Sequence, residues 1–204
     1  MDPIRTARRV AASTALTLAA ACGPPKGIAT GTAAAAGPPP PPSPRKLGDV
    51  FVLEAGGAQP DDTVVTVPSG ARRVVVLRRS APDFGLFAEL DFPARALTGT
   101  RDAAGARVAI RPRPGLYALD FELDGSVAEG ATITFSYGAH FVAPAGARER
   151  YGSDIAFERA LSIGRLVGDT LVVFLQTSRP GSDMLSAPLP GPGRYLVAAP
   201  RSGP

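Results

Sequence analysis

Residues 47–204 are predicted to form an all-β fold, an antiparallel β-sandwich. Two observations predict this class. Apolar and polar residues alternate over several segments, which is typical of strands that bury one face. Turn residues separate these segments at short intervals, and no long segment shows helical periodicity. We therefore expect one sandwich domain over these residues, preceded by segments of a different kind.

Three alternating segments, at residues 84–92, 117–124 and 131–142, are expected to be strands with one face on the core. The residues expected to point inward are Phe84, Leu86, Ala88, Leu90 and Phe92; Tyr117, Leu119, Phe121 and Leu123; and Ala131, Ile133, Phe135, Tyr137, Ala139 and Phe141. The third segment places His140 on its polar face. We therefore interpret His140 as a surface histidine, and expect its replacement by alanine to change stability little.

Four apolar runs, at residues 50–53, 64–67, 74–77 and 171–175, are expected to be more fully buried strands. Turn signals separate the predicted strands at Gly56-Gly57, Pro68-Ser69-Gly70, Pro114-Gly115, Asp124-Gly125, Gly168-Asp169 and Pro192-Gly193. Gly168-Asp169 predicts a tight hairpin. Residues 145–160 leave three alternatives open: a loop, a single helical turn, or a strand that begins at Ile155.

The end of the chain resembles the last part of small Ig-like sandwich domains of bacterial envelope proteins. The residues that carry this resemblance are "FERALSIGRLVGDTLVVF" and "APLPGPGRYLVAAP". The resemblance implies a hairpin followed by a Gly-x-Tyr strand that returns into the core, with Gly193 and Tyr195 at those places. Many such domains have a tryptophan in the hairpin, and this chain has none. The resemblance implies an architecture and no chemistry.

The first 21 residues have the order of regions of an export signal. Arg5, Arg8 and Arg9 precede an apolar run at residues 10–21 that ends in three alanines. This run is too short to span a hydrocarbon core about 30 Å thick. A short alanine-rich surface helix is the alternative. We predict a signal peptide over residues 1–21.

Cys22, the single cysteine of the chain, directly follows the three alanines. This arrangement resembles the lipobox of bacterial lipoproteins, with one departure, because Ala19 stands where the family prefers leucine. The resemblance implies a diacylglycerol on the Cys22 thiol, cleavage before Cys22, and acylation of the new amine. The rival is cleavage after Ala21, which would leave an exposed free thiol in an oxidising compartment. We therefore expect lipidation at Cys22, with palmitate as a usable label.

The lipid predicts a membrane partner and a location in the cell envelope. Gly23 follows Cys22 where an aspartate retains related lipoproteins at the inner membrane, so the sequence favours the outer membrane. Residues 22–46 are rich in Pro, Ala and Gly, and residues 37–44 predict extended polyproline II. We interpret residues 22–46 as a disordered tether that acts as a spacer.

The positive charge of the chain belongs to its first part. Residues 1–46 carry a net charge of +5, whereas residues 47–204 contain 16 arginines and 17 acidic residues. A nucleic-acid partner needs a basic footprint on the folded part, and therefore none is expected. With one cysteine, no internal disulfide can form.

The search for chemistry in residues 47–204 predicts no catalytic residue, no metal ligand and no cofactor site. His140 stands alone where metal sites use three or four ligands, and no Gly-x-Ser-x-Gly elbow accompanies it. Asp120 to Gly125 resembles the start of a calcium loop, but Ala131 stands where a bidentate glutamate is needed.

Two arginine pairs, Arg72-Arg73 and Arg78-Arg79, bracket the predicted strand at residues 74–77. They would form either an anion-binding rim or charged strand ends that block edge-to-edge pairing, and the second interpretation is favoured.

Together these features predict a cell-envelope lipoprotein with a non-catalytic binding, scaffolding or structural sandwich. Another envelope protein or a polymer is a candidate partner. The alternative is a secreted or envelope hydrolase that uses a pair of carboxylates, because 17 acidic residues allow many pairs.

Overall fold

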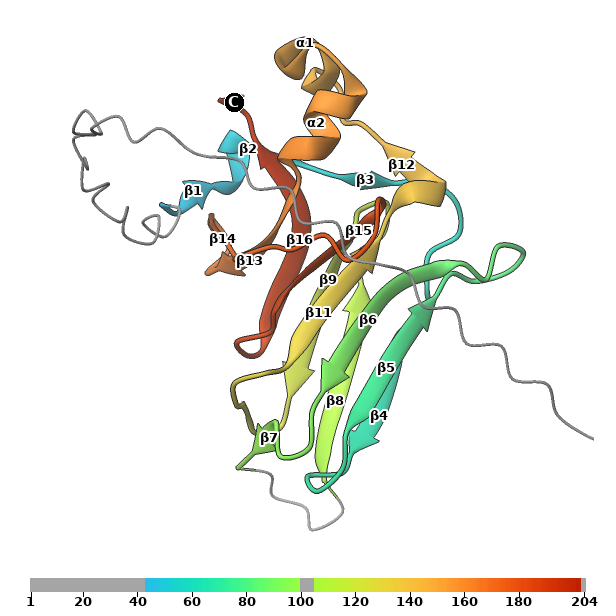
Figure 1. The fold of residues 1–204 in the computed structure, drawn as a ribbon, viewed down its shortest axis with the longest axis vertical. Helices are drawn as coiled ribbons and strands as arrows, with labels where there is room; N and C mark the ends of the chain where they lie inside the picture. The colour runs from blue at the N-terminus through green and yellow to red at the C-terminus, as the bar shows by residue number, and fades with distance from the viewer. Residues whose placement is uncertain (1–42, 100–104, 203–204) are drawn as a thin grey trace, which may run out of the picture. The chain divides into compact units, whose positions relative to one another are not determined.

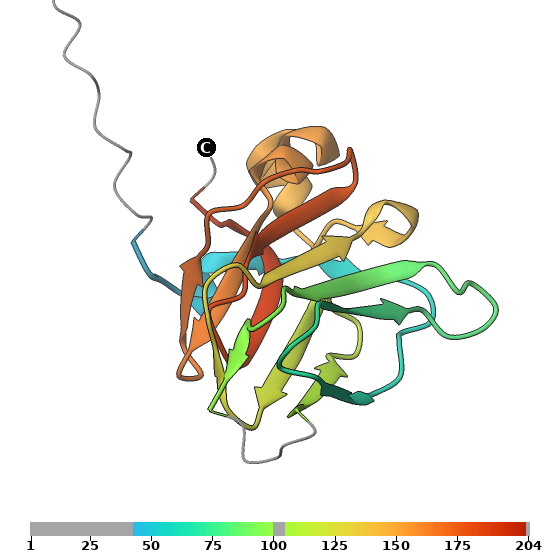
Figure 2. The same cartoon turned by 60° about the horizontal axis from the view of Figure 1, so that its bottom comes forward.

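The computed structural model describes residues 43–99 and 105–202. Within them, antiparallel sheets pack face to face in an all-β sandwich, which confirms the predicted fold class (Figure 1 and Figure 2). None of the helices in these residues has the length and apolar character that a membrane crossing needs.

The larger sheet contains β16 near its middle and β4 at one end. Its strand order is β1 (Arg45–Lys46), β14 (Leu171–Phe174), β13 (Ser162–Val167), β16 (Gly193–Pro200), β9 (Ala118–Leu123), β8 (Ala106–Pro112) and β4 (Thr63–Val67). Strand β2 (Val50–Val52) also pairs with β16, along residues 198–200. The 3-10 turn η1 (Leu47–Asp49) joins β1 to β2.

The smaller sheet has the order β15 (Met184–Pro188), β11 (Thr132–Ser136), β6 (Leu86–Phe92) and β5 (Arg73–Arg78). Two short ribbons complete the strands: β7 (Leu97–Thr98) with β10 (Ser126–Val127), and β3 (Glu54–Ala55) with β12 (Phe141–Val142).

The main core lies between the two sheets and follows the predicted alternation. Tyr117, just before β9, and Leu119 and Phe121 within it are buried, as are Ile133 and Phe135 of β11. Burying each such side chain contributes about 1.5–3 kcal/mol, so this shared face is the main source of stability. Aromatic contacts link the sheets, since the rings of Phe87 and Tyr117 stack with centroids 5.3 Å apart.

Two of the alternating segments are shorter than predicted. Strand β6 begins at Leu86, and Phe84 lies before it, 60% exposed with a positive φ of 53°. A register irregularity between Leu77 and Arg78 occurs at this end of the strand pair, so Phe87 points into the core instead. The third segment leaves the sheet after Ser136, and the 3-10 turn η2 (Gly138–His140) follows.

The expectation that four apolar runs are more fully buried than the alternating strands is wrong for three of them. Val64, Val76 and Leu171 are 54%, 43% and 39% exposed. Strands β4 and β5 each end a sheet, and β14 has only the two-residue β1 beyond it. Strands at such places bury one face against the core and leave the other to solvent, so their apolar residues alternate between the two environments.

Residues 145–160 form two short helices, α1 (Ala147–Tyr151) and α2 (Asp154–Ala160). Of the three alternatives, a strand from Ile155 is wrong, and the single helical turn comes nearest but falls short, because the segment contains two helices. Ser153 begins α2, and its side chain accepts a hydrogen bond from the Ala156 amide. Phe157 is fully buried beside Phe51 and anchors α2 to the sandwich.

Two predicted features of the last part of the chain are confirmed. Gly168 has a positive φ of 59° in the turn between β13 and β14, which pair as an antiparallel hairpin. Tyr195 in β16 is fully buried, and its hydroxyl donates to the Gly191 carbonyl oxygen at 2.5 Å.

Candidate functional site

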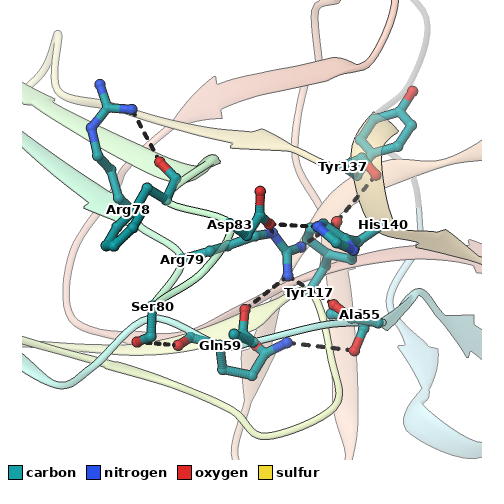
Figure 3. Close-up of polar contacts among 12 residues, drawn as sticks. Ala55, Gln59, Arg78, Arg79, Ser80, Asp83, Tyr117, Tyr137 and His140 are labelled. Carbon is teal, nitrogen blue, oxygen red and sulfur yellow. Dashed lines mark hydrogen bonds and ion pairs between the residues drawn. The ribbon is translucent and has the colours of Figure 1, made fainter.

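Arg79 is the one charged residue that is buried within residues 43–99 and 105–202, at 2% exposure. It directly follows β5, and its guanidinium lies among loops from three parts of the chain (Figure 3). One terminal nitrogen donates to the carbonyl oxygens of Gly56, at 2.8 Å, and Ala58, at 3.1 Å. The other donates to the Tyr117 hydroxyl at 2.6 Å. This arrangement corrects the prediction that Arg79 is an exposed strand end.

Aromatic rings and a carboxylate complete the surroundings of Arg79. Its guanidinium carbon lies 5.4 Å from the Phe87 ring centroid and 5.3 Å from that of Tyr117. Its Nε is 3.6 Å from Asp83 Oδ2. Buried charges persist in proteins when they are paired and hydrogen bonded in this way, so Arg79 serves as a structural cross-link between loops.

His140 contacts the same carboxylate, with its Nε2 2.5 Å from Asp83 Oδ2 (Figure 3). Both side chains are 27% exposed. The predicted surface position of His140 is therefore wrong, because the chain turns through η2 here and brings the ring over Gly57. A Cβ at Gly57 would lie 2.8 Å from the imidazole, so glycine permits this packing.

The buried contacts continue through two tyrosines. The Tyr117 hydroxyl donates to the Tyr137 carbonyl oxygen at 3.1 Å. The Tyr137 hydroxyl accepts from Arg179 at 2.9 Å and lies 3.1 Å from Glu158 Oε1. Burial raises the pKa of both phenols above its ordinary value, although the charges of Arg79 and Arg179 oppose the shift. Both hydroxyls are therefore protonated at neutral pH.

The Arg79 cluster, meaning Arg79, Asp83, Tyr117, Tyr137 and His140, offers little for catalysis. Its neighbour Ser80 donates to the Gln59 carbonyl oxygen at 2.8 Å, so the Ser80 hydroxyl is not arranged as a nucleophile activated by His140. In the part of the chain that the structure describes, no group of three or more His, Cys, Asp or Glu residues could hold a metal ion.

Asp120, the first residue of the stretch that resembles a calcium loop, lies in β9 and faces two arginines. Arg194 Nε donates to Asp120 at 2.6 Å, and an Arg113 nitrogen donates to the same carboxylate at 3.3 Å.

The two arginine pairs that bracket β5 contain three further members besides Arg79. Arg72, Arg73 and Arg78 are exposed, and Arg72 forms an ion pair with Asp91.

A second feature lies on the outer face of the larger sheet, away from the main core. A hollow of about 370 Å³ opens there, which we call the outer hollow. Its floor consists of Val50, Ala118, Leu166 and Leu196, which are 2–7% exposed and belong to an apolar cluster separate from the main core. It is thus the concave apolar feature that a binding site needs.

The rim of the outer hollow is charged. Arg113, Arg194 and Arg201 line it, together with Glu54. Arg201 lies over the Phe51 ring, 4.2 Å from its centroid, and its Nε donates to the Val50 carbonyl oxygen at 3.1 Å. Arginines at an apolar mouth can bind an anion while the apolar floor takes a hydrocarbon group.

Comparison of the chain with protein-family models, with curated protein sequences and with solved structures gave no match. The resemblance to Ig-like envelope domains therefore stays a prediction.

The one predicted site residue, Cys22, lies outside the described residues, and its lipidation stays a prediction. Sequence reasoning missed the buried Arg79 and the outer hollow. A signal for Arg79 was present, because Val75, Leu77 and Arg79 follow the two-residue period of a strand and all three are buried. The floor of the hollow has no comparable signal, because its residues come from four different strands.

Proposed function

We propose that this protein is a cell-envelope lipoprotein whose sandwich is a non-catalytic binding module. The observation that supports a non-catalytic binding module is the contrast between two sites. The polar groups of the Arg79 cluster are engaged with backbone carbonyls and with each other. The outer hollow, in contrast, combines an open apolar floor with a rim of three arginines and one carboxylate, Glu54, which suits recognition of a ligand.

The proposed anchor rests on the amino-terminal sequence. An export-type leader, a cysteine after three alanines and a proline-rich tether follow one another in the order that resembles bacterial lipoproteins. One acyl chain binds a membrane only marginally, whereas two or more hold a protein firmly. An extended tether rises about 3.1 Å per residue, so it would hold the domain away from the membrane surface. Gly23 favours the outer membrane as the location.

The alternative, a hydrolase with two carboxylates, has less support. A general acid of that class needs a raised pKa, which burial away from cations provides. In the described residues, Asp91, Asp120, Glu122 and Asp154 each form ion pairs with arginine. The hydrogen bond from Arg148 lowers the pKa of Asp154, which is the opposite of what a general acid requires.

Metabolic labelling tests the anchor. We expect the wild-type chain, expressed in a bacterium with labelled palmitate, to carry the label and to fractionate with membranes. Cys22→Ser should abolish the label, whereas Ser13→Ala, a small change within the same leader, should keep it. A wild-type protein that is labelled no better than Cys22→Ser overturns the anchor. Reaction of its cysteine with a maleimide, together with a mass that corresponds to a chain beginning at Cys22, would then identify cleavage after Ala21.

A further inference from the structure

The floor of the outer hollow lies on a face of the larger sheet that the smaller sheet does not cover. Ala118 and Leu196 are directly paired between β9 and β16, and Leu166 of β13 lies beside them. Along β9, the same face changes from Ala118 to Asp120 and then to Glu122. The hollow therefore sits where an apolar surface meets a charged one, which is the arrangement that an amphiphilic ligand requires.

The size of the outer hollow restricts the ligand. Sites for small molecules have volumes of about 300–1,000 Å³. At about 370 Å³, the outer hollow lies near the lower limit of this range. It offers room for one hydrocarbon chain and excludes a ligand whose two acyl chains must both be buried.

The charges on the rim restrict the head group. A guanidinium has five N–H donors. The hydrogen bonds within the described residues use two donors of Arg194 and one each of Arg113 and Arg201. Arg113 and Arg194 share the Asp120 carboxylate, and Glu54 is the other acid at the rim. Three arginines against these two acids leave an excess of one positive charge, which matches a single carboxylate.

We propose that the outer hollow binds a free single-chain fatty carboxylate, with its chain on the apolar floor and its head group on the arginines of the rim. This inference rests on the proposed function, because it names the ligand class of the proposed binding module. Arg201 is held over the Phe51 ring and by the Val50 carbonyl oxygen, so its remaining N–H groups are oriented before the ligand arrives. Such pre-organisation suits a bidentate contact with a carboxylate.

The test is isothermal titration calorimetry of dodecanoate, below its micellar concentration, into the full chain carrying Cys22→Ser. This substitution removes the lipid attachment. It also separates the outcome from the proposed anchor, which the palmitate experiment tests. We expect saturable binding of one dodecanoate, at least about tenfold tighter than that of dodecyltrimethylammonium, which has the same chain and the opposite charge.

Two substitutions should weaken dodecanoate binding by about tenfold each. Arg201→Gln removes a charged donor from the rim, and Ala118→Leu fills the floor. Arg111→Gln is the matched control, because Arg111 also lies on the outer face but pairs with Glu122 and does not line the hollow. It should leave the affinity unchanged. Unaltered urea midpoints would establish that the variants are folded.

Four results would overturn the proposal. The first is that dodecanoate shows no saturable binding, and the second is that dodecyltrimethylammonium binds equally well. The third is that Arg201→Gln and Ala118→Leu leave the affinity for dodecanoate unchanged. The fourth is that Arg111→Gln lowers this affinity as much as they do. Vesicles of phosphatidylglycerol distinguish the other lipid source. Binding to such vesicles without binding of free dodecanoate would assign the arginines to a membrane surface and would also overturn the proposal.

Discussion

The two ends of strand β5 carry the same residue type in opposite environments. Arg72 precedes the strand with 67% of its side chain exposed, and it donates to both oxygens of Asp91, at 2.9 and 2.7 Å. Arg79 follows the strand with 1% of its side chain exposed. Six residues of β5 separate them, and the local sequences are both Arg-Arg. The difference is that one guanidinium is solvated by water and the other by protein.

This contrast shows what each arginine contributes. The Arg72–Asp91 pair exchanges contacts with water for contacts with each other, so its removal changes little. Removing Arg79 would leave two carbonyl oxygens and the Tyr117 hydroxyl without their donor inside the protein. Of two arginines that the sequence does not distinguish, the fold therefore depends on Arg79 and not on Arg72.

The largest effect is expected for Arg79→Met, which keeps the apolar stem and removes the donors. We expect the free energy of unfolding to fall by about 3–5 kcal/mol, because Asp83 and the carbonyl oxygens lose a buried partner. Urea titration followed by circular dichroism measures this loss. Arg72→Met is the matched control and should leave the urea midpoint nearly unchanged. Equal urea midpoints for Arg79→Met and Arg72→Met would show that the buried contacts of Arg79 stabilise the fold no more than the exposed ion pair of Arg72.

A smaller effect extends the comparison to buried phenols. All four tyrosines, Tyr117, Tyr137, Tyr151 and Tyr195, have a pKa that burial raises, and that of Tyr195 is raised to about 12. The unfolded chain loses its phenolic protons near pH 10, before the folded chain does. The stabilisation is therefore complete below about pH 10 and is lost as the pH rises through the folded pKa.

For Tyr195 alone, the loss above pH 12 approaches about 3 kcal/mol. Alkaline titration of the tyrosinate absorbance measures it. We expect the signal to appear together with loss of the far-ultraviolet β spectrum, because ionisation is easier in the unfolded chain and therefore favours unfolding. Ionisation near pH 10 with the fold intact would contradict the burial of these rings. Tyr195→Phe should reduce the alkaline sensitivity.

The smallest loss, apart from that of the Arg72 control, is expected at the partly exposed edge of the Arg79 cluster. His140→Ala removes the contact with Asp83 Oδ2 and should lower the free energy of unfolding by about 1 kcal/mol. This value lies between those for Arg79 and Arg72, as the intermediate exposure of His140 requires. The measurement is a double-mutant cycle with Asp83→Ala, where additive losses would mean that the pair has no coupling.

The predictable part of the fold depended on local patterns. The two-residue period identified β9 and β11, because a strand with one face on a core must place apolar residues at every second position. The glycine at residue 168 identified a hairpin, because its positive φ suits few other residues. The same period still holds at Tyr137, which is buried just after β11 ends at Ser136, and it fails at Ala139, which is exposed in η2.

The candidate site was less predictable for a physical reason. The sequence by itself determined several of the strands, though not β8 or β15, the place of several turns, and the small net charge of the domain, since these follow from neighbouring residues and composition. Only the tertiary structure decided that Val64 and Val76 lie on edge strands, that Arg79 is buried, and that Val50, Ala118, Leu166 and Leu196 meet in one hollow. Burial and concavity depend on which strands become neighbours, and that choice minimises the free energy of the whole sandwich rather than of any one segment.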